Sequence, residues 1–417
     1  MTTPNSAWFT ESRFGMFIHW GIYSLAARHE WIQNYERIAA EDYQKYFDYF
    51  DPDLYDPVQW AQRARDAGMK YVVLTTKHHD GFCLWDSALT DFKAINTPYG
   101  KDLLAPFVQA FRDAGLKIGF YHSLIDWHHP EFPLDGHHPM RDDLAFREQE
   151  KGRDIRKYQD YLHGQVRELL TGYGKIDIMW FDFSYPVRSW DWAAGKGKDD
   201  WRSEELMAMV RELQPGILFN NRLDVPGDFV TPEQYQPLSP MTVNGEPVLW
   251  EACQTLNGSW GYDRDNLNWK SSEMLIQMLV DSVSKNGNLL LNVGPNGRGE
   301  FEPRAIERLN DIGAWMRVNG RSIYGCSASK YTVPTGCRYT QRGNRLYVHL
   351  LSWPFGHVHL PDMAGKVAYA QFLHDASEIK MAEYEQETVD YVAPDGVPPG
   401  TLSLVLPVQT PAVTTPV

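Results

Sequence analysis

The feature that most constrains the fold is a repeated alternation of short apolar segments with amphipathic helical segments over roughly the first 325 residues. Each apolar segment is nearly continuous in hydrophobic character, which is typical of strands buried on both faces of a parallel sheet. We expect strands at Met16–His19, Tyr71–Thr75, Lys117–Tyr121, Ile176–Phe181, Gly216–Asn220, Pro247–Trp250 and Asn288–Asn292. The helical patterns between them cover Pro57–Ala67, Leu103–Ala114, Arg153–Thr171, Ser203–Leu213, Ser271–Ser284 and Pro303–Asn319.

Repeated strand–helix units build either a (β/α) barrel or a doubly wound sheet. The barrel is favoured because no glycine-rich phosphate turn follows the first strand. The glycine-rich segments at 172–175 and 294–299 fit neither the P-loop nor the dinucleotide-binding fingerprint. We therefore predict an α/β fold in which a TIM-like (β/α) barrel occupies residues 1–328.

The pattern changes after about Ser329. Short alternating segments separated by Gly, Pro and Asp follow, and they predict strands at Arg345–Leu350, Lys366–Phe372, Ile379–Tyr384 and Thr401–Leu406. Such a series is typical of a small antiparallel β-sandwich, which we assign to a C-terminal domain over residues 329–417.

The charge balance limits the partners of this chain. With 40 Lys and Arg against 54 Asp and Glu, the formal net charge is −14. An acidic protein is a poor match for nucleic acid or an anionic membrane surface, and no apolar run approaches the roughly 18 residues of a membrane span. Sequence alone leaves a homo-oligomer open.

The cysteines and the N-terminal residues bear on the compartment. Cys83, Cys253, Cys326 and Cys337 show no paired spacing, and the first residues lack a basic segment followed by an apolar one. We expect free thiols and a cytoplasmic location.

Polar side chains follow several of the predicted strands. Active sites of (β/α) barrels lie at the carboxyl ends of the strands, so these residues are the first candidates for function. They are His19, His78, His79, His122, Asp182, Asn220, Arg222 and Glu251. Aromatic residues make up 13% of the chain, which indicates either a large core or a sugar site walled by rings. A ring of His, Trp, Asp, Arg and Glu suits recognition of a hydroxylated ring.

Two carboxylates can carry chemistry, and each has a plain structural alternative. Asp182 follows the apolar segment Ile176–Phe181, which would place it at the barrel mouth; it can equally cap the next helix. Glu233 lies in a loop rich in turn residues, where a lone glutamate is usually solvated.

A catalytic metal is not expected. His29 and Glu30 lack the second histidine of a zinc-protease helix, and His78 and His79 are adjacent, so on a strand they would point in opposite directions. No GxSxG segment suggests acyl transfer, and no cofactor is predicted.

Taken together, these segments resemble the α-L-fucosidases of glycoside hydrolase family 29. The resemblance covers roughly residues 8–325. It is carried by Arg13–Ser24, Glu30–Trp31, Tyr71–Phe82, Leu84–Ser87, Gly119–Ser123, Trp180–Asp182, Thr231–Glu233, Trp250–Glu251, Ser259–Tyr262 and Val283–Pro295.

The resemblance implies a retaining exo-glycosidase that removes terminal α-L-fucose from glycans or glycosides through a covalent fucosyl-enzyme. On that pattern Asp182 is the nucleophile and Glu233 the general acid/base, with Glu251 as the alternative acid/base. The implied fucose-binding set is His19, Glu30, His78, His79, Trp180, Arg222 and, near the methyl group of the sugar, Trp260. The implied substrate is a fucosylated oligosaccharide or glycoside.

Two other functions stay open at this point. A catalytically silent sugar-binding protein could keep the same barrel mouth, although the presence of both carboxylates argues against it. Another retaining specificity, such as α-L-galactosidase, is the second alternative, because an apolar pocket rejects an added hydroxyl only weakly.

Overall fold

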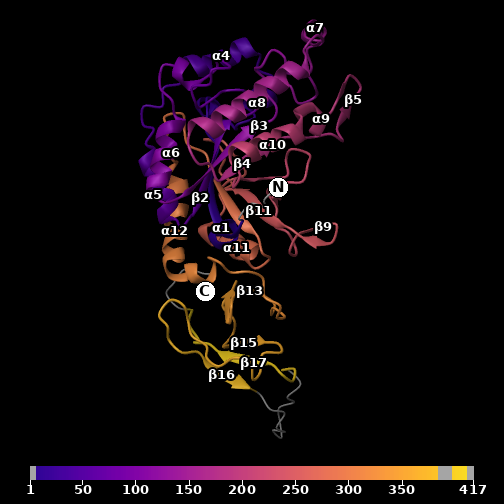
Figure 1. The fold of residues 1–417 in the computed structure, drawn as a ribbon. Helices are drawn as coiled ribbons and strands as arrows, with labels where there is room; N and C mark the ends of the chain where they lie inside the picture. The colour runs from indigo at the N-terminus through magenta and orange to yellow at the C-terminus, as the bar shows by residue number, and fades with distance from the viewer. Residues whose placement is uncertain (1–5, 384–396, 411–417) are drawn as a thin grey trace.

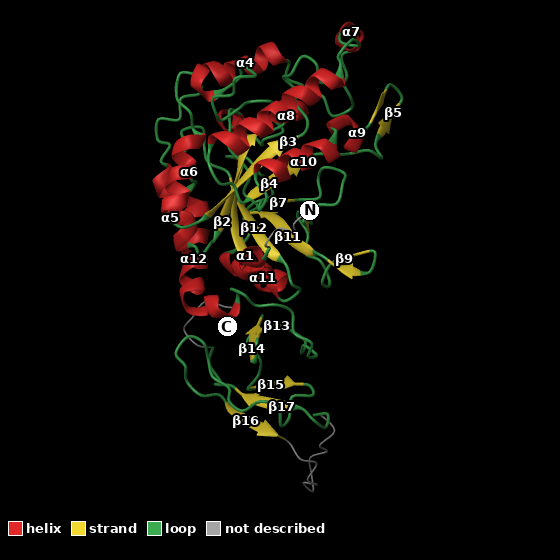
Figure 2. Cartoon of the chain, in the orientation of Figure 1, coloured by secondary structure: helices red, strands yellow, loops and turns green. Residues whose placement is uncertain are grey.

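The computed structural model describes residues 6–383 and 397–410, and most of it is a parallel β-barrel wrapped by helices (Figure 1 and Figure 2). The eight strands pair side by side in the order β7-β4-β3-β2-β1-β12-β11-β8. They are β1 (Phe14–Ile18), β2 (Tyr71–Lys77), β3 (Lys117–Ser123), β4 (Ile178–Asp182), β7 (Leu218–Phe219), β8 (Phe229–Val230), β11 (Leu249–Thr255) and β12 (Asn288–Val293). The predicted barrel is confirmed.

The barrel closes where β7 meets β8. An isolated parallel bridge pairs Asn220, directly after β7, with Phe229. Gly227 lets the connecting segment pass close by, because a Cβ at this position would lie 2.4 Å from the carbonyl carbon of Asn220. We call this junction the seam; β7 and β8 are only two residues long on either side of it.

The helices that cover the barrel follow the predicted pattern. Asp56 caps one of them by accepting a hydrogen bond from the backbone of Gln59, and Ser271 caps another through Met274. The covering helices are α5 (Pro57–Asp66), α6 (Leu104–Asp113), α8 (Ile155–Gly172), α10 (Ser203–Leu213), α11 (Ser272–Val283) and α12 (Pro303–Asn319). Each predicted helix is therefore confirmed, with ends that differ by a few residues.

Short elements fill the connections. The helices are α1 (Ala7–Ser12), α2 (Tyr23–Ala26), α3 (Ile32–Tyr35), α4 (Ala40–Asp48), α7 (Leu144–Gln149), α9 (Lys198–Trp201), η1 (Ala94–Asn96) and η2 (Gly320–Ser322). Two small hairpins project from the barrel: β5 (Ser189–Trp190) with β6 (Ala193–Ala194), and β9 (Thr242–Val243) with β10 (Glu246–Pro247).

Several strand predictions end too early, and one strand was missed; β2, predicted to end at Thr75, continues to Lys77. β11 runs to Thr255, so the strand predicted at Pro247–Trp250 was ended too early. β3 likewise extends beyond Tyr121 to Ser123. β8 was not predicted, because it is two residues long and lies in a segment rich in turn residues.

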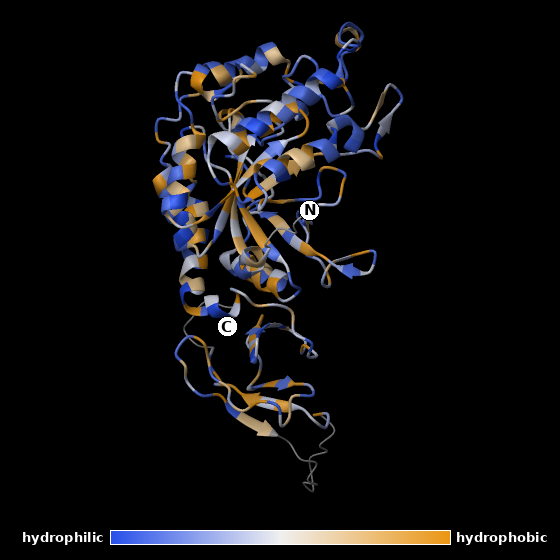
Figure 3. Cartoon of the chain, viewed as in Figure 1, coloured by the Kyte–Doolittle hydropathy of each residue, from blue (hydrophilic) through white to orange (hydrophobic). Residues whose placement is uncertain are grey.

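The core has two layers, and the strands between them are the most apolar part of the chain (Figure 3). One layer lies between the strands and the helices. The other fills the barrel, and it is rich in rings: Phe17, Tyr71, Tyr121, Trp180 and Phe229. Phe9 from α1 packs on Phe229 with ring centroids 5.0 Å apart. It thereby closes the end of the barrel opposite the carboxyl ends of the strands, which we call the floor.

Beyond the barrel lie two small antiparallel sheets, of which the first lies next to α11 and the second farther away (Figure 1). They consist of β13 (Cys337–Arg342) with β14 (Arg345–Leu350), and of β15 (His357–Leu360), β17 (Leu402–Val405) and β16 (Lys380–Glu383). Arg338 joins them to the barrel by donating to Asp281 on α11 at 2.6 Å. Cys326 packs in the barrel core and Cys337 in the C-terminal core, and the predicted boundary at 328/329 lies between them.

Some predictions for this C-terminal part are wrong. Lys366–Phe372 is mostly irregular, with an isolated bridge between Gln371 and Glu378, and Gly365 directly before it has a positive φ of 68°. β13 and β15 were not predicted. The segment predicted at Ile379–Tyr384 contains β16, and Tyr384 lies outside the described residues. No helix in the described part of the chain has the length and hydropathy that crossing a membrane requires.

Candidate active site

The alternation of side chains along each strand decides what reaches the barrel mouth. Ile178 and Trp180 of β4 point into the barrel, so Asp182, two residues further, continues the same face at the carboxyl end. His19 follows Phe17 of β1 in the same way. The inward-facing side chains are thus apolar inside the barrel and polar at the carboxyl ends of the strands.

These groups surround one cavity at the barrel mouth. Its volume is about 440 Å³ including the open entrance. Of the catalytic pair and the fucose-binding set implied by the family resemblance, every residue except Glu30 lines it, whereas the strand-end candidates His122, Asn220 and Glu251 do not. The lining residues are Phe17, His19, Trp31, His78, His79, Tyr121, Trp180, Asp182, Phe183, Arg222, Glu233, Cys253 and Trp260.

Asp182 sits at the inner end of this cavity and is held by two donors. Arg222 Nη1 donates to Oδ1 at 2.9 Å, and the hydroxyl of Tyr121 donates to Oδ2 at 2.8 Å. Burial raises the pKa of Asp182 to about 6, while the guanidinium of Arg222 opposes this rise. At neutral pH the carboxylate is therefore ionised, fixed in orientation and open to the cavity.

Glu233 lies on the loop after β8. Its backbone pairs with Cys253 of β11, and the next residue, Gln234, donates its N–H to the Cys253 carbonyl at 3.0 Å. The carboxylate accepts from Arg222 Nη2 at 2.7 Å, and 40% of the side chain is exposed. Glu233 is thus a solvent-facing carboxylate at the rim of the cavity.

Arg222 connects the two carboxylates through a single guanidinium. Its Nε donates to Thr231 Oγ1 at 2.9 Å, and its guanidinium carbon lies 4.9 Å from the ring centroid of Trp180. These contacts fix the plane of the guanidinium, so Asp182 and Glu233 are held no further apart than one guanidinium can bridge.

The three histidines of the mouth are neutral at pH 7. Burial lowers the pKa of His19 to about 3, and it lowers the pKa values of His78 and His79 well below the usual value. His19 Nδ1 contacts Asn292 Oδ1 at 2.7 Å, and His79 Nδ1 contacts Ser123 Oγ at 2.6 Å. Within the described residues His78 Nδ1 has no hydrogen-bond partner. Neutral imidazoles of this kind can donate to and accept from sugar hydroxyls.

Trp260 forms one wall of the cavity, and Glu30 lies behind it. Glu30 is fully buried and accepts from the backbone N–H groups of Trp260 at 3.2 Å and Gly261 at 2.8 Å. Burial raises the pKa of Glu30. The structure therefore brings Glu30 to the site through the Trp260 backbone and does not place it on the cavity wall.

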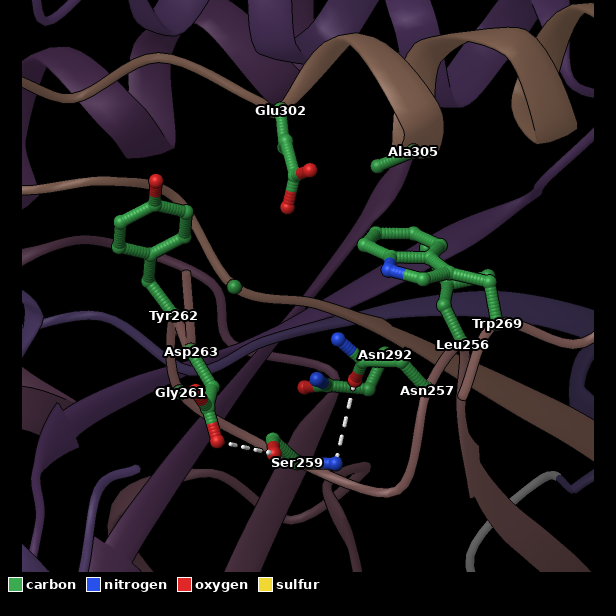
Figure 4. A pocket seen from close by; sticks show the side chains of 11 residues that line it. Leu256, Asn257, Ser259, Gly261, Tyr262, Asp263, Trp269, Asn292, Glu302 and Ala305 are labelled. Atoms are coloured by element: carbon green, nitrogen blue, oxygen red, sulfur yellow. Dashed lines mark hydrogen bonds between the residues drawn. The ribbon is translucent and has the colours of Figure 1, made fainter. Parts of the chain in front are cut away.

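A second, smaller cavity is lined by residues on either side of Trp260 in the chain. Figure 4 shows the carboxylate of Glu302 directed into it. Ser259 donates to Asp263 at 3.1 Å, and Asn292 donates to the Trp260 carbonyl at 2.7 Å. These bonds hold the loop that carries Trp260.

Glu251, the alternative acid/base, does not reach the mouth. Because β11 continues to Thr255, Glu251 lies two residues below Cys253, on the barrel floor. It accepts from the hydroxyl of Tyr71 at 2.5 Å and from Trp180 Nε1 at 3.3 Å, and it is fully buried. The proposal of Glu251 as acid/base is wrong for this geometry, since its carboxyl group is fully buried and does not line the cavity.

Sequence reasoning missed several lining residues. Tyr121 is the most important, because it donates to Asp182. The candidate chosen from that strand was His122, which points to the opposite face and contacts Thr76 behind the sheet. Counting residues in twos along β3 would have selected Tyr121, and the same rule finds Phe17. Trp31 and Phe183 lie in loops, where no periodicity indicates direction.

A metal centre has no support in the ranges that the structure describes. No group of three or more His, Cys, Asp or Glu side chains is arranged there to hold an ion.

Comparison with known proteins shows the family to which this chain belongs. The family model for α-L-fucosidase matches residues 1–321. This chain belongs to the α-L-fucosidase family. The human tissue α-L-fucosidase is 30% identical over 389 residues, covering 84% of this chain and 76% of the human protein. The rat tissue α-L-fucosidase is 30% identical over 387 residues, covering 84% and 77%.

Solved structures of fucosidases share the whole architecture. α-L-Fucosidase isoenzyme 1 from Paenibacillus thiaminolyticus is 48% identical with a TM-score of 0.90, over 97% of this chain and 96% of that one. A family 29 α-L-fucosidase from Bacteroides thetaiotaomicron, trapped as a covalent intermediate with 2-fluoro-fucosyl fluoride, is 27% identical with a TM-score of 0.82 over 99% and 95%. Both the barrel and the C-terminal sheets thus have counterparts in this family of glycoside hydrolases.

Proposed function

We propose that this chain is a retaining exo-α-L-fucosidase in which Asp182 is the nucleophile and Glu233 the general acid/base. The observation that carries the proposal is the pair of carboxylates bonded to one guanidinium at the mouth of a barrel. Asp182 is fixed on a strand inside the cavity, and Glu233 stands on a loop at its rim. Retaining glycosidases need two carboxyl groups with such unlike surroundings.

In the first step Asp182 Oδ attacks the anomeric carbon of a terminal α-L-fucoside, and the bond to the leaving oxygen breaks. A proton from Glu233 goes to that oxygen, so the aglycone leaves as an alcohol. In the second step Glu233 removes a proton from water, which attacks the fucosyl-enzyme and returns the Asp182 carboxylate. The product is L-fucose with the same anomeric configuration as the substrate.

Arg222 contacts both carboxylates of the proposed mechanism. It donates to Glu233 through Nη2 and to Asp182 through Nη1, and the second contact holds the nucleophile in place.

The remaining lining residues suit one deoxy sugar. Neutral His19, His78 and His79 offer hydrogen bonds to hydroxyl groups, and the indole of Trp260 supplies an apolar wall for a methyl group. A neutral glycan is also consistent with the net charge of −14. We further propose a cytoplasmic location, for which the four free, buried cysteines are the support; cell fractionation tests it.

The experiment is hydrolysis of an aryl α-L-fucoside by the wild type and by Asp182→Ala, each with and without azide. We expect loss of turnover in the variant, partial rescue by azide, and β-L-fucosyl azide as the product. Proton NMR of the wild-type reaction should show α-L-fucose first. Unchanged activity in Asp182→Ala would show that Asp182 is not the nucleophile. Equal rates on an aryl α-L-galactoside would show that the enzyme does not select L-fucose over L-galactose.

A further inference from the structure

His78 and His79 both line the cavity, although they are adjacent in the chain. Side chains alternate between the two faces of a strand, so a regular continuation of β2 would send one of them behind the sheet. By that alternation His78 would follow Val72 and Leu74, whose side chains pack between the strands and the helices. The direction of the side chains must therefore change between Leu74 and His78.

The change occurs at a β-bulge near the carboxyl end of β2. The pairing of β2 with β3 is regular up to Thr75, and then Thr76 is skipped, so that Lys77 takes the next partner on β3. The hydroxyl of Thr76 donates to the Tyr121 carbonyl at 2.7 Å. A bulge re-aims the side chains that follow it, and bulges are common next to active sites. Lys77 consequently points behind the sheet, and His78 is turned toward the cavity.

The side chain of Lys77 is fully buried behind the sheet. Its ammonium group lies 5.2 Å and 5.7 Å from the ring centroids of Tyr161 and Tyr158 on α8. Nζ donates to Asp126 Oδ2 at 3.1 Å, and this carboxyl group is buried as well. Burial raises the pKa of Asp126, but chiefly the charge of Lys77 outweighs this effect and the pKa lies below its usual value. The carboxylate is therefore ionised at neutral pH.

Asp126 connects this ion pair to the loop after β3. Its Oδ1 accepts from the backbone N–H groups of His128 at 3.0 Å and His129 at 2.8 Å. The next residue, Trp127, donates its backbone N–H to the His79 carbonyl at 2.8 Å, and its ring packs on the His79 ring with centroids 5.5 Å apart. The ion pair thus fastens the loop after β2 to the loop after β3, next to His79.

Both imidazole rings depend on this backbone for their direction. The ring of His78 stacks on Tyr121, with centroids 5.7 Å apart and planes at 14°. His79 Nδ1 contacts Ser123 Oγ at 2.6 Å, and its Nε2 lies 3.8 Å from Asp182 Oδ2. Because burial keeps both imidazoles neutral, they bind hydroxyl groups through directed hydrogen bonds and not through charge. The direction of each ring therefore decides what it can bind.

We propose that Lys77 is a positioning residue, whose ion pair with Asp126 holds the bulge that turns His78 and His79 together toward the hydroxyl groups of the sugar. This inference rests on the proposed function and adds to it a group that does not contact the substrate. Burying two charges costs free energy, and apolar residues often replace such a pair without loss of stability. The geometry that the pair imposes is therefore the property to test.

The test compares an aryl α-L-fucoside with three monodeoxy analogues, each of which lacks one ring hydroxyl. For each analogue the measured quantity is kcat/KM on the fucoside divided by kcat/KM on the analogue. A variant that is only less stable lowers all of these rates alike and leaves the ratios unchanged. His78→Ala and His79→Ala identify which ratios depend on the two rings.

Three variants change the ion pair. Lys77→Met removes the ammonium group and keeps the length of the side chain, and Asp126→Asn removes the charge of its partner. The double variant Lys77→Met/Asp126→Asn leaves no unpaired charge buried, which keeps the test decisive if a single variant does not fold. Lys196→Met is the matched control, because Lys196 also forms a buried pair, with Asp135, and neither residue lines the cavity.

We expect the ratios that depend on the histidines to fall about three- to tenfold in the three variants of the ion pair, as the loss of one hydrogen bond predicts. They should stay at the wild-type value in Lys196→Met, even where its melting temperature falls. A crystal structure of Lys77→Met gives a second readout that does not depend on turnover. We expect it to show an altered pairing of β2 with β3 and at least one of the two imidazoles turned out of the cavity.

Unchanged ratios in every folded variant of the ion pair would overturn the proposal. An unchanged bulge with both imidazoles still in the cavity of Lys77→Met would overturn it as well. Failure of the proposed function is a separate outcome, in which the wild type hydrolyses none of the fucosides, and the crystal structure of Lys77→Met then still decides whether the ion pair holds the bulge.

Discussion

The two ends of the barrel interior each hold a buried carboxyl group. Comparing Asp182 at the mouth with Glu251 on the floor shows which surroundings suit a catalytic group and which suit a structural one. Burial raises the pKa of Asp182 at the mouth to about 6 and that of Glu251 on the floor to about 7. Asp182 bonds a guanidinium and faces a cavity. Glu251 bonds only the neutral groups of Tyr71 and Trp180 and is sealed.

A raised pKa by itself therefore does not mark the reactive group. Burial produces the shift at both ends, but only the mouth combines it with a charged partner and access for substrate. Trp180 lies between the two, with its indole N–H on Glu251 and its ring beneath Arg222. Glu251 on the floor thus orients the indole of Trp180, and Arg222 at the mouth packs on that indole.

The largest expected effect lies at the mouth. We expect Asp182→Ala to lower kcat on an aryl fucoside by about 10⁴-fold, as loss of a nucleophile does in other hydrolases. The melting temperature should change little, because Arg222 retains Glu233 as a partner. Steady-state kinetics measures kcat, and calorimetry measures the melting temperature. A large fall in the melting temperature would show that Asp182 stabilises the fold, as we expect of Glu251.

Glu233→Ala should have the next largest effect, and its size should depend on the leaving group. For a fucosyl disaccharide we expect a loss of about 10²- to 10⁴-fold in kcat/KM, the range for general acid catalysis. A 2,4-dinitrophenyl fucoside needs no protonation of its leaving oxygen and should lose much less. Equal losses on the two substrates would contradict the assignment of Glu233 as the acid.

On the floor the expected effect is on stability. Glu251→Ala leaves the Tyr71 hydroxyl and the Trp180 N–H without an acceptor, which we expect to cost about 3 kcal/mol in the free energy of unfolding. Glu251→Gln is the control, since the amide can bond both groups. Urea unfolding at pH 7 measures the difference, and equal stability of the Ala and Gln variants would show that these bonds contribute nothing.

The smallest expected effect is a pH dependence that differs between the two ends. Asp182 must be ionised to attack, so kcat/KM should fall below pH about 6, by about tenfold per pH unit. Glu251 has a pKa above its usual value in the folded protein, so its ionisation lowers stability as the pH rises from about 4.5 to 7. Glu251→Gln should remove this second dependence and leave the acidic limb of kcat/KM in place.

The sequence was sufficient to predict those parts of the fold in which a repeating apolar pattern marks the strands and their ends. The continuous apolar strands predicted the barrel, and the strand end at Phe181 placed Asp182 at its mouth. Glu251 was misplaced because the apolar pattern of β11 stops at Trp250, whereas the strand continues through Cys253 and Gln254. His122 was chosen over Tyr121 by residue type, although the two-residue period favours the tyrosine.

Loops and short elements could not be predicted by this route. Phe183 and Trp31 reach the cavity from loops, whose direction no sequence periodicity predicts. β8 has two residues, which are too few to show an alternation of apolar and polar side chains. Family resemblance implied the roles of Glu233, Trp260 and Glu30, and the structure adds that Glu30 accepts from the backbone N–H groups of Trp260 and Gly261. The cytoplasmic location and the oligomeric state stay predictions.

The seam of the barrel sets the two carboxylates in differently paired surroundings. Asp182 belongs to β4, which pairs with β3 along its whole length, whereas Glu233 follows β8, which pairs with β11 at two residues and meets β7 through one isolated bridge. Opening the seam breaks few backbone hydrogen bonds, so amide protons of residues 229–231 should exchange with deuterium sooner than those of 178–182. The acid/base thus stands beside the junction with the fewest backbone bonds, and the nucleophile stands on a strand paired along its length.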